Sequence, residues 1–246
     1  MKVLVPITKA PDTTSKIQFK ENNTKFDDEN VQWILNPSDE WYALVRGLEL
    51  KESFGGELTT VTVGGSEDEQ SIRKAMALGA DESVRVDAQA RDAYYVAAQI
   101  AAYAQDKGFD IILTGKETID HNGGQVGGML AELLDMPYVA NASSLQVEGD
   151  KASLEHPIPG GSQTVEGALP LVVSCAKGMA EQRIPNMRGI MAARKKQITV
   201  VEAQDVEERT GVSSFELPPP KSECKFVDAE KPEELIDLLH NEAKVI

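Results

Sequence analysis

The residues best suited to chemistry lie in segment 115–129, a polar loop that carries five glycines. An apolar run over residues 110–114 ends at Gly115, and a run of helical spacing follows Gly124. The first turn of a helix offers free backbone N–H groups and the positive end of the helix dipole, which together bind phosphate. One glycine is enough for a plain strand-to-helix turn, so five favour close approach of a ligand. The segment predicts a site for the phosphate of an adenine nucleotide.

The motifs of nucleotide-consuming enzymes do not accompany this loop. The chain has no GxxxxGK followed by Ser or Thr, and no GxGxxG follows the first predicted strand. A P-loop NTPase is therefore excluded and a Rossmann dehydrogenase gains little support. The loop fits the holding of a nucleotide better than phosphoryl transfer. Asp120 and His121 leave a hydrolase open as an alternative, but they have no partner nucleophile or metal motif, and a polar loop contact or a solvent-facing pair explains them better.

Metal and disulfide chemistry find no support in the spacing of their usual residues. The three histidines are scattered, and Cys175 and Cys224 lie far apart without a CxxC or Cys/His pattern. Structural zinc sites and disulfide frameworks show regular spacings of these residues. We expect two inert thiols in a reducing compartment.

Two further segments are predicted to meet the same edge of a sheet as the glycine-rich loop. The first strand ends at Pro6, and Asn36, Pro37, Ser38 and Asp39 precede a helix. Their backbone groups can reach an adenine or a ribose, although ordinary helix capping by Ser38 or Asp39 is the alternative. Val63 ends another strand and could pack beneath the base.

A hydrophobic and basic patch over residues 183–196 stands out in an acidic chain. It combines methionines with a run of Arg and Lys, and exposed methionine adapts to varied protein partners. We interpret the patch as a docking surface. A core helix with a solvated basic end is the alternative.

Composition limits the partners of the 246-residue chain. Lys and Arg total 25 against 40 Asp and Glu, which gives a net charge of −15. A field of this sign repels nucleic acid and anionic membrane surfaces. The sequence has no apolar run near the roughly 20 residues that a spanning helix needs, and its N-terminus does not resemble a signal peptide. We expect a soluble protein without direct membrane insertion, cytoplasmic if bacterial.

The elements that position these residues alternate between strand and helix. Five apolar runs predict buried strands, over residues 2–7, 58–63, 83–86, 110–114 and 169–175. Helical spacing occupies the intervals, including residues 66–79 and 92–106. This alternation is typical of an α/β protein with a doubly wound, mostly parallel sheet of the Rossmann-like, adenine-nucleotide-binding type.

The pattern changes after about residue 141. Two short β-like pieces cover residues 145–147 and 153–156, and the tail carries three consecutive prolines at 218–220. A final amphipathic run at 232–245 predicts a helix, either self-contained or seated on another surface. We expect a nucleotide-binding domain over residues 1–205, with a recognition segment at about 183–198, and a C-terminal arm over residues 206–246 that wraps a partner subunit.

Several of these segments together resemble the β subunit of electron transfer flavoproteins. Five segments of the chain match the family in the family's order. They are the opening strand with the residues up to Asp12, the pair Asn36 and Pro37, the helix at 72–81, the loop with Gln125, and the run at 189–196. The resemblance covers nearly the whole chain. It implies a heterodimer whose α subunit holds most of the redox-active FAD, while this chain holds a structural AMP.

The resemblance also assigns roles to residues of this chain. Electrons would arrive from acyl-CoA and related dehydrogenases and leave to a membrane quinone oxidoreductase, with this subunit itself not catalytic. The implied AMP contacts are Pro6, Asn36, Pro37, Ser38, Asp39, Val63, Gly115, Lys116, Glu117, Thr118, Ile119, Asp120, His121, Asn122, Gly123, Gly124, Gln125 and Val126. The implied docking residues are Met187, Arg188, Ile190, Met191, Arg194, Lys195 and Lys196, with Met187 as the apolar anchor. The compartment would be the cytoplasm of a bacterium or the mitochondrial matrix of a eukaryote.

The chain departs from the family pattern at four positions. Val126 replaces a Thr, Gly124 an Asn and Met187 a Leu, while Gln163 stands where several relatives have Glu. Loss of the Thr hydroxyl leaves more of the phosphate to the backbone. It also leaves open the electron-bifurcating branch, in which a second FAD replaces AMP, although the run at 189–196 resembles the non-bifurcating branch. A stand-alone nucleotide-binding stress or signalling module is a further alternative.

Overall fold

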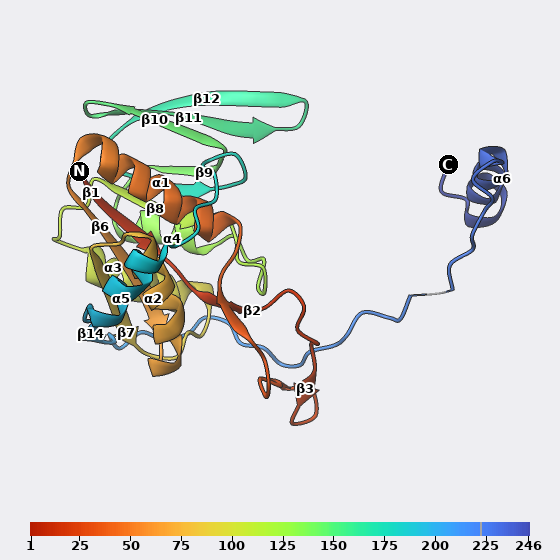
Figure 1. Cartoon of the computed structure of the whole chain (residues 1–246), viewed down its shortest axis with the longest axis horizontal. Coiled ribbons are helices and arrows are strands. Elements are labelled where there is room, and N and C mark those ends of the chain that lie inside the picture. The colour runs from red at the N-terminus through yellow and green to blue at the C-terminus, as the bar shows by residue number, and fades with distance from the viewer. Residues whose placement is uncertain (222) are drawn as a thin grey trace.

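A seven-stranded parallel sheet forms the centre of the protein in a computed structural model that describes residues 1–221 and 223–246 (Figure 1). Neighbouring strands of this sheet run parallel, and most of its residues are buried. In spatial order the strands are Thr199–Glu202 (β14), Glu82–Asp87 (β7), Glu57–Gly64 (β6), Lys2–Pro6 (β1), Ile111–Gly115 (β8), Leu171–Cys175 (β13) and Tyr138–Ala142 (β9).

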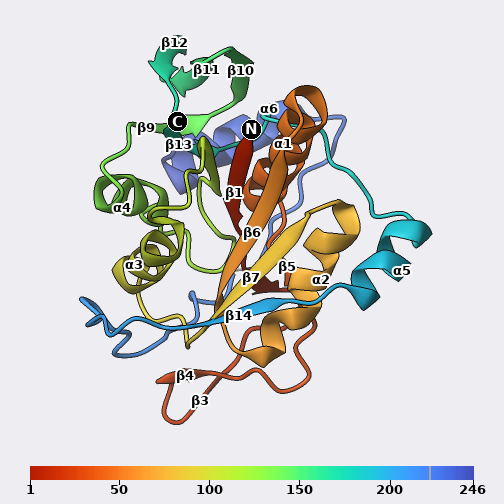
Figure 2. The ribbon, with the colours of Figure 1, turned by 90° about the vertical axis from the view of Figure 1, so that its left-hand side faces the viewer.

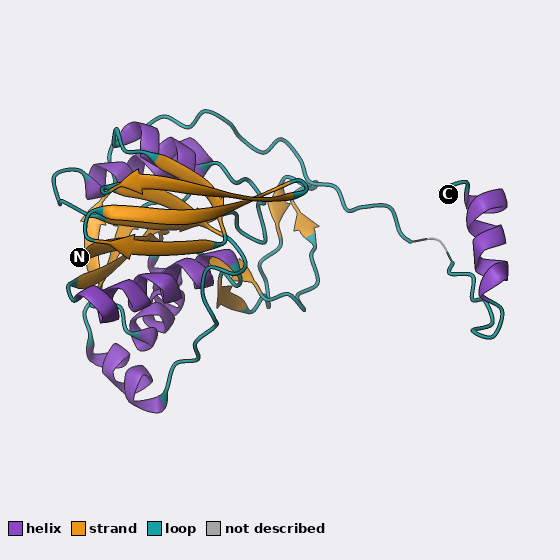
Figure 3. Cartoon of the chain, turned by 90° about the horizontal axis from the view of Figure 1, so that it is seen from above, coloured by secondary structure: helices purple, strands orange, loops and turns teal. Residues whose placement is uncertain are grey.

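Helices cover both faces of the sheet (Figures 2 and 3). Asp39–Phe54 (α1) and Glu69–Leu78 (α2) lie on one face, and Ala93–Ala104 (α3) and Val126–Leu133 (α4) on the other. Alternate residues of a strand point to opposite faces, so Val3 and Val5 join the core beneath α1 whereas Leu4 joins the core beneath α3. The prediction of a doubly wound α/β fold is confirmed.

The direction of winding reverses between β1 and β8. The chain passes from β1 through α1 to β6 and through α2 to β7, and then returns through α3 to β8 on the other side of β1. In open α/β sheets, ligands bind at the carboxyl ends of strands where the winding reverses. The segments that follow β1 and β8 are therefore the ones placed to form a site.

The five predicted strands are present, with small shifts of their ends. A separate antiparallel sheet consists of Ser144–Glu148 (β10), Lys151–Ile158 (β11) and Gly161–Ala168 (β12), with β11 in the middle. The sequence did not predict strands β9, β12 and β14. Strand β12 is largely exposed on both faces, so it has no hydrophobic alternation to reveal it.

The segment between β1 and α1 also contains strands that the sequence did not reveal. Lys9–Pro11 (β2) pairs with Trp33–Leu35 (β5), and Phe19–Lys20 (β3) pairs with Lys25–Phe26 (β4). These ribbons project from the carboxyl edge of the sheet and return the chain to Asn36.

Ser38 and Asp39 were predicted as alternative caps of α1, and the structure shows no side-chain capping bond there. Ser38 occupies the N-cap position with a φ of 67°, whereas a capping residue takes extended backbone that turns its side chain toward the helix. Similarly, Ser66–Asp68 forms a 3₁₀ turn (η1) ahead of α2. Both helices begin near the carboxyl edge without a side-chain cap.

The C-terminal third ends away from the sheet. Met187–Lys195 (α5) packs against α2, and the chain then forms β14 before it leaves the body. Pro232–Asp237 (α6) continues as a π-helical turn, Leu238–Ala243 (η2), and Figure 1 shows this helix at the end of a long extended trace. No helix within the described residues is both long and apolar enough to cross a bilayer.

The interior strands of the sheet should carry much of the stability. Ile112 on β8 is fully buried between the two layers of helices. We expect Ile112→Ala to lower the free energy of unfolding by about 3 kcal/mol, because it removes buried methyl groups and leaves a cavity. Urea unfolding measures the change. Val200→Ala, on the exposed face of edge strand β14, should cost less than about 0.5 kcal/mol, and equal losses would contradict this account.

Candidate functional site

Three segments that are distant in the sequence meet beyond the carboxyl ends of β1 and β8. Asn36, which is fully buried, lies at their centre. Its Nδ2 donates to Thr8 Oγ1 at 3.2 Å, and its Oδ1 accepts from the backbone N–H of Ile119 at 3.3 Å. Its own N–H donates to the Thr8 carbonyl at 2.9 Å. Asn36 therefore ties the end of β1 and the start of α1 to the glycine-rich loop.

A buried carboxyl group completes this cluster. Glu40, in the first turn of α1, accepts from the Thr8 N–H at 2.7 Å and lies 3.1 Å from the Thr8 hydroxyl. Only 5 % of Glu40 is exposed. Gly115 lies against it so closely that a Cβ there would come within 2.8 Å of the Glu40 nitrogen. Any residue larger than glycine would push the end of β8 away from α1.

The cluster keeps its negative charge low at neutral pH. Burial raises the pKa of Glu40 from 4.5 to about 8, and the nearby Asp120 and Asp39 carboxylates add to this shift although hydrogen bonds from Thr8 oppose it. Burial also raises the pKa of Asp39, and the Lys116 ammonium opposes that rise. Glu40 is therefore mainly neutral at pH 7, which reduces the repulsion that a phosphate would meet here.

The amino end of α4 faces the same region. Gln125 stands at its N-cap without a side-chain capping bond, so the first N–H groups of the helix are available. The preceding residues 119–125 are exposed, and Asn122 and Gly124 have positive φ angles of 49° and 60°. The geometry offers backbone donors on an open loop, as the sequence predicted.

The glycines of the loop do not all serve one purpose. Gly115 is required by the contact with Glu40, and a Cβ at Gly127 would lie 2.8 Å from the Thr114 hydroxyl. These two allow the chain to pack on itself. A Cβ at Gly123 would meet open space, and one at Gly124 would only reach the Lys116 carbonyl at 3.6 Å. Only part of the glycine signal therefore points to a ligand.

The structure brings most of the sequence-predicted nucleotide residues to this edge. Pro6 and Val63 end neighbouring strands, but both are buried, and the Val63 side chain packs into the core beneath α3. Lys116 is partly exposed, and its ammonium pairs with Glu117 at 2.9 Å. The remaining predicted positions lie in the two connecting segments: Asn36, Pro37, Ser38, Asp39, Gly115, Thr118, Ile119, Asp120, His121, Asn122, Gly123, Gly124, Gln125 and Val126.

Asp120 and His121 have the geometry of a surface pair. The His121 ring is 80 % exposed, and its Nε2 lies 3.7 Å from Asp120 Oδ2. Only hydrogen bonds within the loop hold the His121 backbone. In the part of the chain that the structure describes, no group of three His, Cys, Asp or Glu residues could hold a metal ion.

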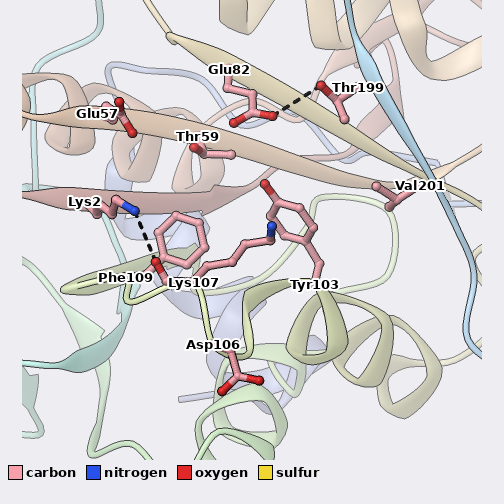
Figure 4. Close-up of a pocket in the computed structure, with 10 residues that line it drawn as sticks. All are labelled: Lys2, Glu57, Thr59, Glu82, Tyr103, Asp106, Lys107, Phe109, Thr199 and Val201. Atoms are coloured by element: carbon pink, nitrogen blue, oxygen red, sulfur yellow. Dashed lines mark hydrogen bonds between the residues drawn. The ribbon is translucent and has the colours of Figure 1, made fainter.

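A cavity of about 370 Å³ opens at the opposite, amino-terminal edge of the sheet (Figure 4). Its walls mix Lys2 and Lys107 with Glu57 and Glu82, and the Lys107 ammonium lies 4.6 Å from the centre of the Tyr103 ring. Charges of both signs line it, and none of the predicted nucleotide residues reaches it. This cavity is therefore separate from the candidate site at the carboxyl edge.

Helix α5 presents two different faces. Its inner face contains Gly189 and Ala193, and a Cβ at Gly189 would lie 2.2 Å from the Ala77 carbonyl of α2. Arg73 of α2 donates to the carbonyls of Ala193 and Lys196 at 2.9 and 3.1 Å. Lys196 itself donates to the Ala80 carbonyl at 2.6 Å, so this predicted docking residue holds α5 in place.

The outer face of α5 is apolar and basic. Met187 and Met191 are 73 % and 52 % exposed, and Arg194 and Lys195 follow them along the same side. Ile184, just before the helix, is 89 % exposed. Residues at i, i+4 and i+7 share one side of a helix, which places these side chains in a single stripe. Arg188 is exposed and Ile190 half-buried at its margin.

Three residues of these sites were not predicted from the sequence. Thr8 and Glu40 build the buried cluster, and Arg73 fixes α5. A glutamate in the first turn of a helix is ordinary because it complements the helix dipole, so nothing in the sequence marked Glu40 as buried. Likewise, nothing in the sequence around Arg73 indicated that it would bond to the carbonyls of Ala193 and Lys196.

The structure defines a doubly wound α/β protein whose candidate site lies where the winding reverses between β1 and β8, and the comparisons narrow this class. Residues 23–206 match the Electron transfer flavoprotein domain family. The chain is 36 % identical to the electron transfer flavoprotein subunit beta of Bacillus subtilis (strain 168), and the alignment covers both chains fully. It is 32 % identical to the subunit of the same name from Sus scrofa, with 100 % of this chain and 99 % of that one covered. The chain belongs to the family of electron transfer flavoprotein β subunits.

The buried carboxyl group should make stability depend on pH. In the unfolded chain Glu40 loses its proton near 4.5, but in the folded chain only near 8, so the free energy of unfolding should fall as the pH rises between these values. Glu40→Gln can keep the contacts with Thr8 and has no proton to lose. We expect its unfolding free energy to fall less over this range.

Urea unfolding at several pH values between about 5 and about 9 measures this slope. Glu132→Gln, at an exposed position of α4, is the matched control and should keep the wild-type pH dependence. An unchanged slope in Glu40→Gln would show that Glu40 does not retain its proton.

Proposed function

We propose that this chain is the β subunit of a heterodimeric electron transfer flavoprotein and holds a structural AMP at the carboxyl edge of its sheet. The partner α subunit would hold most of the FAD, which accepts electrons from acyl-CoA and related dehydrogenases and passes them to a membrane quinone oxidoreductase. The chain would not itself be catalytic. Its outer α5 face would dock the dehydrogenase.

One observation carries the nucleotide assignment. The glycine-rich loop and the segment before α1 converge on Asn36 at the point where the winding of the sheet reverses. Uncapped helix starts supply N–H donors at that point. The side-chain charges of Lys116 and Glu117 largely cancel, so the phosphate would be held mainly by backbone groups.

The identity of the nucleotide can be tested by content. We expect the purified heterodimer, denatured and resolved by chromatography, to release one AMP and one FAD. Gly124→Ala should lower AMP occupancy, because it strains a backbone with φ of 60° beside the helix start. Gly149→Ala, at a positive φ in a distant turn, is the matched control and should keep full AMP content.

A different nucleotide or flavin content of the purified protein would identify one of the alternative functions. Two flavins and no AMP would overturn the AMP assignment and favour the electron-bifurcating branch, with which Val126 is compatible. A stable, monodisperse chain that does not associate with an α subunit on co-expression would instead favour a stand-alone nucleotide-binding module.

The docking assignment is supported by the asymmetry of α5. Its inner face packs on α2 at Gly189 and is bonded by Arg73, and Lys196 just after the helix bonds to Ala80 just after α2, so the outer stripe is held in position. Large exposed apolar side chains within basic surroundings are typical of protein interaction surfaces. An acidic rim around an apolar pocket would be the complementary surface on a dehydrogenase.

We expect Met187→Ala to weaken this docking. An apolar anchor of this size contributes about 2 kcal/mol when it is desolvated, so electron transfer at low dehydrogenase concentration should slow by at least about tenfold. Flavin content and heterodimer stability should not change. Stopped-flow reduction of the flavin by a dehydrogenase measures the rate.

Ile17→Ala, at an exposed apolar position away from α5, is the control and should transfer electrons at the wild-type rate. A wild-type rate in Met187→Ala would remove Met187 from the docking surface.

A further inference from the structure

The C-terminal arm is fastened to this chain's own body before it extends. Gln99 of α3, which is only 2 % exposed, forms two hydrogen bonds with the backbone of Gln204. Its Nε2 donates to the Gln204 carbonyl, and its Oε1 accepts from the Gln204 N–H, both at 2.8 Å. This pairing mimics the bonds of a β-ladder and continues the path of β14.

A second attachment lies at the start of α3. Asp92 caps this helix, and its Oδ1 accepts from the Tyr95 N–H at 2.7 Å. Its Oδ2 accepts from the N–H groups of Arg209 and Thr210. The Arg209 guanidinium also lies 4.9 Å from the centre of the Tyr94 ring. One carboxylate therefore joins the amino end of a helix to the arm.

A third attachment lies on the N-terminal ribbon. The Phe215 N–H donates to the Asn23 carbonyl at 2.7 Å. The Phe215 ring stacks on Phe19 of β3, with centroids 4.8 Å apart and planes 9° from parallel. Stacking of this kind adds to the burial of the two rings.

The arm has different bonding partners after Phe215. Among the described residues beyond this point, hydrogen bonds and ion pairs join tail residues to one another, as between Lys225 and Glu242. Figure 1 shows the trace leaving the body here and ending in the separate terminal helix. Leu235 and Ile236 of this helix are 47 % and 58 % exposed.

We propose that residues 203–215 form a preformed root that sets the direction of the arm before the partner subunit binds, with Phe19, Asp92 and Gln99 as its positioning residues. The proposal rests on the proposed heterodimer. Residues after 215 would then make the contacts with the partner. A binding segment that is already oriented loses less conformational freedom on association, so the root lowers the cost of forming the heterodimer.

The composition of the terminal segment indicates the surface that it fits. Residues 223–246 carry seven acidic and three basic side chains, and the helix adds exposed leucine and isoleucine. A complementary partner surface is an apolar groove with a basic rim.

Hydrogen exchange of the full-length chain without its partner tests the root directly. We expect the amides of Gln204, Thr210 and Phe215 to exchange at least about tenfold more slowly than those of residues 223–231. Phe215→Ala should remove this protection at the root's end, and Gln99→Leu should remove it at Gln204. Equal exchange rates in the two parts of the wild-type arm would overturn the proposal.

Association with the α subunit tests the consequence. Phe215→Ala should weaken heterodimer formation about tenfold while the body keeps its melting temperature, and Phe215→Tyr should restore it because the stacked ring is retained. Val212→Ala removes an exposed apolar side chain from the same stretch and should bind as the wild type does. Wild-type affinity in Phe215→Ala would overturn the positioning role. A wild-type chain that binds no α subunit would contradict the proposed heterodimer. The exchange measurement, which uses the single chain, would still show whether the root is ordered.

Discussion

The hydrogen-bonded cluster of Asn36, Thr8 and Glu40 is the interaction on which the rest of the site depends. Buried polar groups are costly unless they are paired, so these side chains must keep one another satisfied. Their pairing holds the end of β1, the start of α1 and the loop after β8 in one place. Because Asn36 Oδ1 accepts from the backbone of Ile119, the position of an exposed loop is set by a residue that never reaches the surface.

The same cluster explains how an acidic region can suit an anion. Asp39, Glu40 and Asp120 lie near one another, which would disfavour phosphate if all three were ionised. Desolvation raises the pKa of Glu40 to about 8, which favours its protonated form at neutral pH. The charges of Lys116 and Glu117 largely cancel, so the donors offered to a ligand are mainly backbone N–H groups. These features support the proposal of a structural ligand that is held in place over that of a group that is chemically transformed.

The two surfaces proposed for partners are built on different principles. Helix α5 is held by contacts along its whole inner face, so its exposed methionines have a fixed position. Among the residues that the structure describes, the arm is bonded to the body at its root, and the hydrogen bonds of its distal helix stay within the tail. A rigid surface suits repeated transient docking, whereas a long segment that orders on its partner suits a permanent subunit contact.

The sequence by itself determined the alternation of strands and helices, the doubly wound sheet, the glycine-rich loop, and the basic apolar segment, since each has a local period or composition. It did not determine that Thr8, Asn36 and Glu40 would form one buried cluster, that Gly115 and Gly127 are required for packing, or that Lys196 faces inward. These outcomes depend on contacts between residues far apart in the chain. Burial and the resulting pKa of Glu40 arise from neighbours through space, so only the tertiary structure could decide them.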